Sequence, residues 1–186
     1  ELIERRSPEL MVSISSEVSP QFREYERTNT TAVNAYIMQS TREYLRRMLS
    51  GLKEGGLAGN LYILQSSGGI ALVEAMEKYP VRMVESGPAA GAIMSSFYSR
   101  LLGEPNLVSL DMGGTTAKVC LVEGGEVGLV QEFEADMLRA KPGSGLPISI
   151  PSVDLVEIGA GGGSIARVKM GIITVGPESA GAEPGP

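Results

Sequence analysis

Residues 111–118, with the sequence DMGGTTAK, constrain the fold of this chain more than any other segment, because they lie between two β-type runs. Residues 106–110 form a short apolar run, and residues 117–122 alternate in hydropathy and are rich in β-forming residues. Gly113 and Gly114 lack a Cβ atom, so the backbone can turn tightly and a phosphate can approach the amides closely. The sequence therefore predicts a hairpin able to bind phosphate, although the same pattern also suits an ordinary β-turn.

Three side chains of this hairpin carry the predicted chemistry. Asp111, at the end of the first strand, can orient Mg²⁺ through water, since Mg²⁺ prefers carboxylate and phosphate oxygens. Thr115 and Thr116 supply hydroxyl groups that can donate to phosphate oxygens. Together with the return strand, these residues favour a phosphate-binding hairpin over a plain turn.

The composition excludes several classes of site. No histidine occurs among the 186 residues, so this chain contains no Ser-His-Asp triad and no His-rich zinc site. A net charge of -6 argues against a nucleic-acid partner, and no run of about 18 apolar residues predicts a membrane span. The one cysteine, Cys120, suits a reducing compartment, and we expect a buried structural thiol there. Carboxylates, hydroxyls and backbone amides must therefore carry any chemistry.

A second glycine turn lies earlier in the chain. Residues 61–65 form a short apolar strand, and Ser-Ser-Gly-Gly follows it before an expected helix over residues 70–78. Open α/β sheets place ligands beyond the carboxyl ends of their strands, which makes Ser67 and Gly69 candidate substrate or cleft residues. The alternative is a purely structural role, in which serine caps the helix and glycine makes the bend.

A third glycine-rich loop has four glycines within residues 159–163. Each glycine costs about 0.5–1 kcal/mol of chain entropy relative to alanine, so such loops persist where backbone must approach a ligand or another chain closely. A wide turn or bulge is the alternative. The candidate contact residues are Glu157, which is the weakest of them, Gly161, Gly162, Gly163 and Ser164.

Other elements are predicted from periodicity and turn residues. Apolar residues recur at helical spacing over residues 31–53, and residues 11–15 and 81–84 have strand patterns. Ser86 caps a helix with Pro88 in its first turn. We place a domain boundary at residues 103–105, followed by a β-meander of residues 106–111, 115–122 and 126–133.

Four motifs in this order resemble the hydantoinase A / 5-oxoprolinase family, which includes ATP-dependent N-methylhydantoinases and relatives among acetone and acetophenone carboxylases. They are QSSGG at 65–69, ESGPAAG at 85–91, the hairpin segment 106–122, and VEIGAGGGSI at 156–165. The resemblance implies an α/β fold, part of an actin-like (ribonuclease-H-like) ATPase. Residues 1–104 would form the end of lobe one with the connecting helix, and residues 105–186 the β-meander start of lobe two.

The resemblance also implies an activity and roles for the hairpin. ATP and Mg²⁺ would activate the carbonyl of a cyclic amide such as hydantoin, N-methylhydantoin or 5-oxoproline by phosphorylation, and water would then open the ring. Asp111 would be the catalytic residue that orients Mg²⁺ or the attacking group. Lys118 either joins the phosphate contacts or is a strand-face lysine. The phosphate contacts carried over by position are Gly113, Gly114, Thr115, Thr116 and Lys118.

Partners and alternatives follow from the same resemblance. A hydantoinase B-type subunit, a cytoplasmic location and a homo-oligomer are expectations of the family. A ketone carboxylase subunit, a sugar-kinase-like enzyme and a non-catalytic scaffolding ATPase lobe remain as alternatives. A first phosphate hairpin near the family's N-terminus has no counterpart here, so we expect an internal part of a longer protein that is inactive alone.

Overall fold

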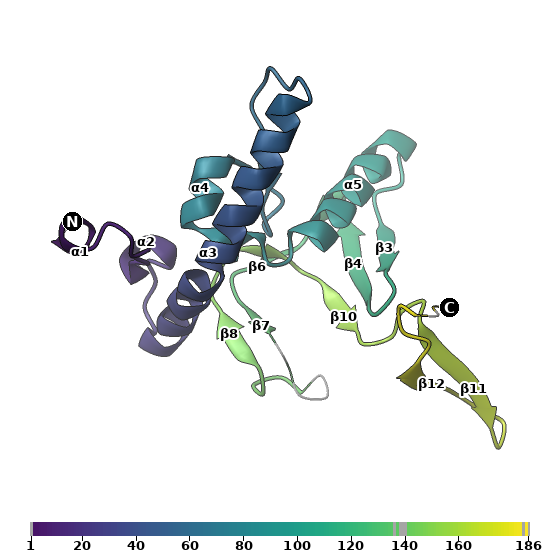
Figure 1. The fold of residues 1–186 in the computed structure, drawn as a ribbon. Coiled ribbons are helices and arrows are strands. Elements are labelled where there is room, and N and C mark those ends of the chain that lie inside the picture. Colours follow the sequence, from purple (N-terminus) through teal and green to yellow (C-terminus); the bar gives the residue numbers. More distant parts are fainter. Residues whose placement is uncertain (1, 136, 138–140, 184, 186) are drawn as a thin grey trace. The chain divides into compact units, whose positions relative to one another are not determined.

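The computed structural model describes residues 2–135, 137, 141–183 and 185. They form two compact units: unit 1 comprises Glu1–Ala89 and Leu129–Val153, and unit 2 comprises Ala90–Gly128 and Asp154–Pro186 (Figure 1). This division differs from the boundary expected at residues 103–105. The chain returns to unit 1 because Ile148 and Ile150 are buried in a cluster with Val18 and Val81.

The helices of unit 1 are dominated by the long helix α3. The element expected over residues 31–53 is confirmed, and it begins earlier than expected, at Glu24. The strand expected over residues 11–15 is wrong, because residues 11–14 have no regular structure and a short helix begins at Ser15. The helical elements of this unit are α1 (Leu2–Arg6), α2 (Ser15–Val18), α3 (Glu24–Glu54), α4 (Val73–Lys78) and the 3-10 helix η1 (Pro80–Met83).

Helix α3 buries a mixture of apolar and polar side chains. Leu45 is fully buried with Val73 and Met76 of α4, as expected for a packing helix. Not every apolar residue of the helix is buried, since Tyr44 is 55% exposed. The helix instead buries Asn34, whose Nδ2 donates to the Lys78 carbonyl at 3.1 Å and whose Oδ1 accepts from the Val81 amide at 3.2 Å.

Among its described residues, unit 1 also has three two-stranded antiparallel sheets. The helix expected over residues 70–78 begins only at Val73, because residues 70–72 pair with residues 62–64 in a hairpin. The strand expected over residues 81–84 is also wrong, since Pro80 starts a 3-10 turn there. The pairs are β1 (Tyr62–Leu64) with β2 (Ile70–Leu72), β6 (Leu129–Val130) with β9 (Ser152–Val153), and β7 (Phe133–Ala135) with β8 (Leu146–Ile148).

Unit 2 contains an antiparallel sheet in the order β10–β4–β3, with β5 added to β4. The first two strands of the expected meander are confirmed, whereas the third is divided: residues 126–127 pair with β4 and residues 129–130 pair with β9. A separate hairpin lies nearer the C-terminus. The elements are β3 (Leu107–Met112), β4 (Ala117–Glu123), β5 (Glu126–Val127), β10 (Val156–Ile158), β11 (Ser164–Lys169) and β12 (Ile172–Ser179).

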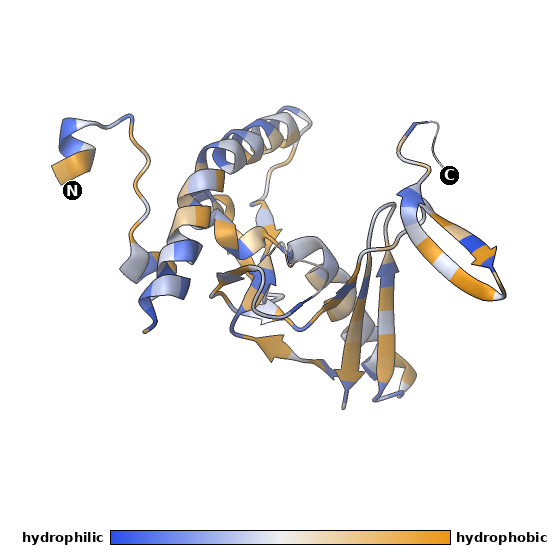
Figure 2. Ribbon diagram, turned by 90° about the horizontal axis from the view of Figure 1, so that it is seen from below, coloured by the Kyte–Doolittle hydropathy of each residue, from blue (hydrophilic) through white to orange (hydrophobic). Residues whose placement is uncertain are grey.

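Helix α5 (Ser86–Leu102) runs from unit 1 into unit 2 and packs on one face of this sheet. Its Ser95 hydroxyl donates to the Ser109 hydroxyl of β3 at 2.8 Å, and its Ser96 hydroxyl donates to the Gly125 carbonyl. The face beneath it buries Cys120. Figure 2 shows long hydrophobic stretches on β3 and β4. None of the described helices is both long enough and apolar enough to span a membrane.

Candidate functional site

The predicted hairpin forms, and its turn presents backbone donors. Strands β3 and β4 pair in register from Leu107–Val122 to Met112–Ala117, and the turn residues 113–115 are exposed. The Gly113 amide donates to the Thr116 carbonyl at 2.9 Å. Within the described residues, the amides of 114–116 have no hydrogen-bond acceptor. An exposed turn with several unpaired N–H groups is suited to hold an anion such as a phosphate.

The glycine-rich loop supports this turn from the same unit. The Gly162 amide donates to the Gly113 carbonyl at 2.9 Å, and the Gly163 amide donates to the Gly114 carbonyl at 2.8 Å. A Cβ atom on Gly161 would lie 2.6 Å from the Thr115 carbonyl carbon, closer than real Cβ contacts. The glycine loop was expected to approach a ligand or another chain, and in the structure it closely approaches the β3–β4 turn of the same chain.

Ser164 closes the glycine loop upon itself. Its hydroxyl accepts from the Gly161 amide at 3.0 Å, and its own amide donates to the Gly161 carbonyl at 2.9 Å. The Gly163 carbonyl accepts from the Ala180 amide at 2.8 Å, which ties the loop to the segment after β12. Ser164 and Gly163 therefore form hydrogen bonds within unit 2, and these bonds stabilise the glycine loop.

Three charged residues form a row across the sheet. Asp111 of β3 and Glu157 of β10 lie directly opposite Lys118 of the central strand β4. The Lys118 side chain is only 15% exposed, and its Nζ lies 3.5 Å from Oε1 of Glu157. The Asp111 side chain is exposed, and its carboxylate faces α5 at Gly91, where a Cβ atom would lie 4.0 Å from Oδ2. Glu157, a weak candidate for a ligand contact, is an ion-pair partner of Lys118.

The described residues contain no group of three metal-ligating side chains. A single carboxylate fits Mg²⁺ held largely by water and phosphate oxygens, because Mg²⁺ keeps several of its waters in nucleotide sites. Asp111 and the unpaired turn amides are the groups here that fit such an ion and its phosphate.

The Ser-Ser-Gly-Gly turn belongs to unit 1 and borders a cavity of about 300 Å³. Ser67 lines this cavity, whereas Gly69 shapes the turn, because its carbonyl accepts from the Gln65 amide at 2.7 Å. Gly68 has a φ of +83°, so it supplies the conformation that the bend requires. The cavity also exposes Arg82, which the sequence did not mark because residues 81–84 have a strand pattern.

A profile of the hydantoinase/oxoprolinase family matches residues 27–186. The chain belongs to this family. The expected family resemblance is thereby confirmed, and the matched residues include the β3–β4 hairpin, the glycine loop and the Ser-Ser-Gly-Gly turn.

Curated relatives have different reactions in their names. The alpha subunit of caprolactamase from Pseudomonas jessenii is 37% identical over 96% of this chain and 25% of its own length. The acetone carboxylase beta subunit of Xanthobacter autotrophicus is 31% identical over 97% of this chain and 24% of its own length. The 5-oxoprolinase of Saccharomyces cerevisiae is 34% identical over 94% of this chain and 13% of its own length. Family membership alone therefore does not select a substrate.

A solved structure supports the fold. The ATP-dependent caprolactamase from Pseudomonas jessenii aligns with a TM-score of 0.79 and 34% identity, covering 100% of this chain and 26% of that chain. The solved structure therefore confirms the expected partial α/β fold, because the chain matches only one part of a larger protein. This chain spans about a quarter of the length of the caprolactamase that it matches.

Proposed function

We propose that this chain is part of an ATP-dependent enzyme that opens a cyclic amide ring, with the hairpin of unit 2 holding ATP phosphates. The observation that carries the proposal is the exposed turn between β3 and β4, whose amides at 114–116 have no acceptor among the described residues and which begins two residues after Asp111. Membership in the hydantoinase/oxoprolinase family supports the reaction class.

Each part of the hairpin has a defined task in this proposal. The amides of Gly114, Thr115 and Thr116 would donate to phosphate oxygens, and the two threonine hydroxyls can add donors. Asp111 would orient Mg²⁺ through water. Bound ATP supplies a phosphoryl group that converts a poorly reactive amide carbonyl into one that water can attack. Most of the protein's contribution is then positioning and charge neutralisation.

Lys118 has a positioning task rather than a direct phosphate contact. Its ion pair with Glu157 fixes a positive charge beside Asp111 on the neighbouring strand. A positive charge directly opposite Asp111 on the neighbouring strand attracts its carboxylate and would help to hold that carboxylate in place for a cation. A Lys118→Met variant should therefore weaken Mg²⁺-dependent nucleotide binding more than nucleotide binding without metal.

A ketone carboxylase subunit is the second candidate function. The 31% identity to the acetone carboxylase beta subunit supports it. Both reactions begin by activating a carbonyl compound with ATP and use the same hairpin, so they differ in what attacks next. A further subunit is part of either proposal, since the caprolactamase and acetone carboxylase relatives are named as subunits.

The test is ATP turnover by the whole protein that contains this chain, together with its partner subunit. Hydantoin, N-methylhydantoin, 5-oxoproline, caprolactam, and acetone with bicarbonate would be compared. We expect one cyclic amide to stimulate turnover. Asp111→Asn should lower the stimulated rate at least 100-fold, because losing one electrostatic contact to the transition state typically lowers kcat by a factor on the order of 10²–10³. Stimulation by acetone and bicarbonate alone would select the carboxylase.

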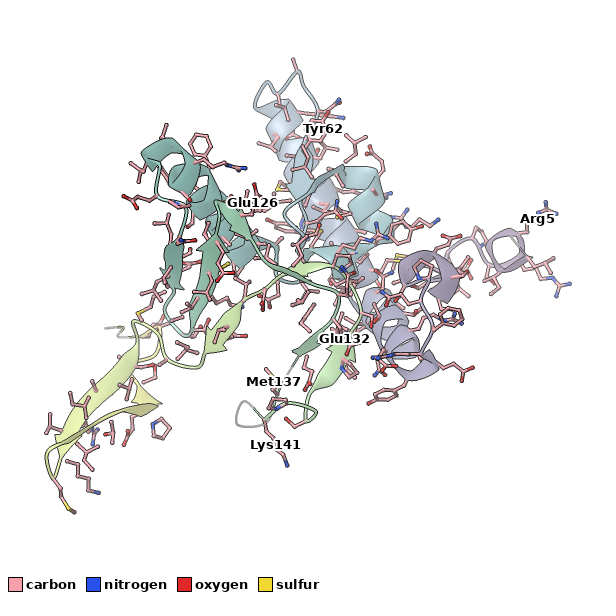
Figure 3. All side chains as sticks on the ribbon, turned by 180° about the vertical axis from the view of Figure 1, so that it is seen from behind. Arg5, Tyr62, Glu126, Glu132, Met137 and Lys141 are labelled. Atoms are coloured by element: carbon pink, nitrogen blue, oxygen red, sulfur yellow. The ribbon has the colours of Figure 1, made fainter. Side chains whose placement is uncertain are left out.

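A matched variant controls for a general charge effect. Glu126 is also exposed and lies at the β4–β5 turn, paired with Arg100 at 2.9 Å (Figure 3). Glu126→Gln removes one carboxylate from the same unit, and we expect near-normal turnover. Equal losses in Glu126→Gln and Asp111→Asn, or turnover that no substrate changes, would contradict the proposal.

A further inference from the structure

The cavity of unit 1 is lined by both polar and apolar groups. Its volume of about 300 Å³ suits a small organic molecule. The polar side chains include Gln65, Ser67 and Arg82, which come from the Ser-Ser-Gly-Gly turn and η1. The apolar side chains include Val18 and Ile150, which are 3% and 1% exposed. A compact ring with one polar edge fits such a lining.

Two of the serines at this cavity already have partners. The Ser19 hydroxyl donates to the Ser149 carbonyl at 3.2 Å, and the Ser149 hydroxyl donates to Glu132 at 2.8 Å. Glu132, labelled in Figure 3, does not line the cavity. The side chains of Gln65 and Ser67 form no hydrogen bond with other described residues, so both remain available to a ligand.

Arg82 is held in place by its own backbone and by an aromatic ring. Its carbonyl accepts from both the amide and the hydroxyl of the fully buried Ser66, at 2.7 and 2.8 Å. Its guanidinium carbon lies 4.9 Å from the centre of the Tyr79 ring. A cation–π contact of this kind does not use the N–H groups of the guanidinium, which stay able to donate. This is a pre-organised cationic donor.

No carboxylate forms an ion pair with Arg82 in the described part of the chain, and Arg82 is the one ionisable side chain among the residues that line this cavity. Arginine presents paired N–H groups whose geometry matches a carboxylate. We propose that this cavity binds the carboxylate of a small molecule, with Arg82 as its counter-ion and Ser67 and Gln65 as further hydrogen-bond partners.

The proposal narrows the substrate class, and that step rests on the proposed cyclic-amide function. A carboxylate-bearing cyclic amide would pair with Arg82, whereas a neutral lactam would leave the guanidinium without a counter-ion. A site built for one polar group rejects an analogue that lacks it, because the site's own groups are then left unpaired. The inferred substrate is therefore of the 5-oxoproline type rather than the caprolactam type.

The test is direct binding to the protein without nucleotide, measured by calorimetry. The probes are 5-oxoproline and 2-pyrrolidinone, which share the five-membered lactam ring and differ by the carboxylate. We expect 5-oxoproline to bind at least tenfold more tightly. Arg82→Leu should remove this preference without changing the affinity for 2-pyrrolidinone, and Arg82→Lys should restore part of it.

Controls separate ligand binding from folding. Arg47→Leu removes an exposed arginine of α3 in the same unit and should leave the preference unchanged. Circular dichroism would verify that each variant is folded; if Arg82→Leu unfolds, Ser67→Val, which keeps Arg82, should still weaken 5-oxoproline binding. Equal affinity for the two probes, or a preference that survives in a folded Arg82→Leu variant, would overturn the inference.

The outcome is distinguishable from that of the proposed function. Arg82-dependent binding of 5-oxoproline without any stimulated ATP turnover would support the carboxylate site and contradict the enzyme proposal. Stimulated turnover with an unchanged substrate preference in Arg82→Leu would support the enzyme proposal and contradict the carboxylate site.

Discussion

Replacing Gly161 with alanine tests whether the glycine loop holds the β3–β4 hairpin in place. The added Cβ atom would lie 2.6 Å from the Thr115 carbonyl carbon and 2.7 Å from the Gly113 carbonyl oxygen. Both neighbours are backbone atoms, so neither can move aside by a side-chain rotation. Either the loop leaves the turn or the turn itself shifts.

The structure gives the size of this effect. If the loop leaves, the hydrogen bonds from Gly162 and Gly163 to the turn carbonyls are lost, at about 0.5–1.5 kcal/mol each. If the loop stays, overpacking costs about 1–3 kcal/mol. Both routes give a loss of about 2 kcal/mol in the free energy of unfolding. For a chain of this length, that lowers the melting temperature by roughly 4–8 °C.

The same loop provides matched controls. A Cβ atom on Gly159 meets nothing within 4 Å, so Gly159→Ala should be neutral or stabilise by about 0.4–1 kcal/mol through the unfolded state. Gly163→Ala should be intermediate, since its Cβ atom would lie 3.0 Å from the Gly114 carbonyl oxygen. The assays are thermal unfolding and NMR exchange of the Gly162 and Gly163 amides. Gly161→Ala with the stability of Gly159→Ala and with both amides still protected would refute the reasoning.

Three further predictions concern other residues. Asn34→Ala should lower the free energy of unfolding by about 2–4 kcal/mol in urea titrations, because the buried Val81 amide loses its acceptor; a loss below about 1 kcal/mol would argue against this. Hydrogen bonds from the amide of Gly143, and then from those of the next residues in that loop, hold the pKa of Glu134 below its usual value. These bonds therefore stabilise the folded protein fully above the usual glutamate pKa, and this stabilisation is lost as the pH falls through the lowered pKa of folded Glu134. The Gly143 amide shift should therefore titrate below about pH 4.3 in NMR, and should not titrate in Glu134→Gln. Burial and a nearby acidic charge raise the pKa of the Cys120 thiol, so iodoacetamide at pH 7 should label it only after denaturation; rapid labelling of the folded protein would contradict a structural role.

The sequence alone predicts those elements of this protein that depend on residues close together in the chain. The hairpin over residues 107–123 follows from β-rich runs on either side of Gly113 and Gly114. Helix α3 follows from a helical pattern that ends at the glycines after residue 54. These features depend on neighbours within a few residues, and so their sequence patterns suffice.

The tertiary structure alone decided what those elements contact. The amide of Ser149 donates to the hydroxyl of Thr30, 119 residues away, and this bond belongs to the segment that returns to unit 1 and helps to build the cavity. The residues at 81–84 have a strand pattern, yet Pro80 and long-range packing give a 3-10 turn that presents Arg82. The glycine loop's partner is likewise a turn from a separate stretch of chain, reached only after folding. Pairings of this kind depend on burial and hydrogen bonding between distant segments, which no local pattern encodes.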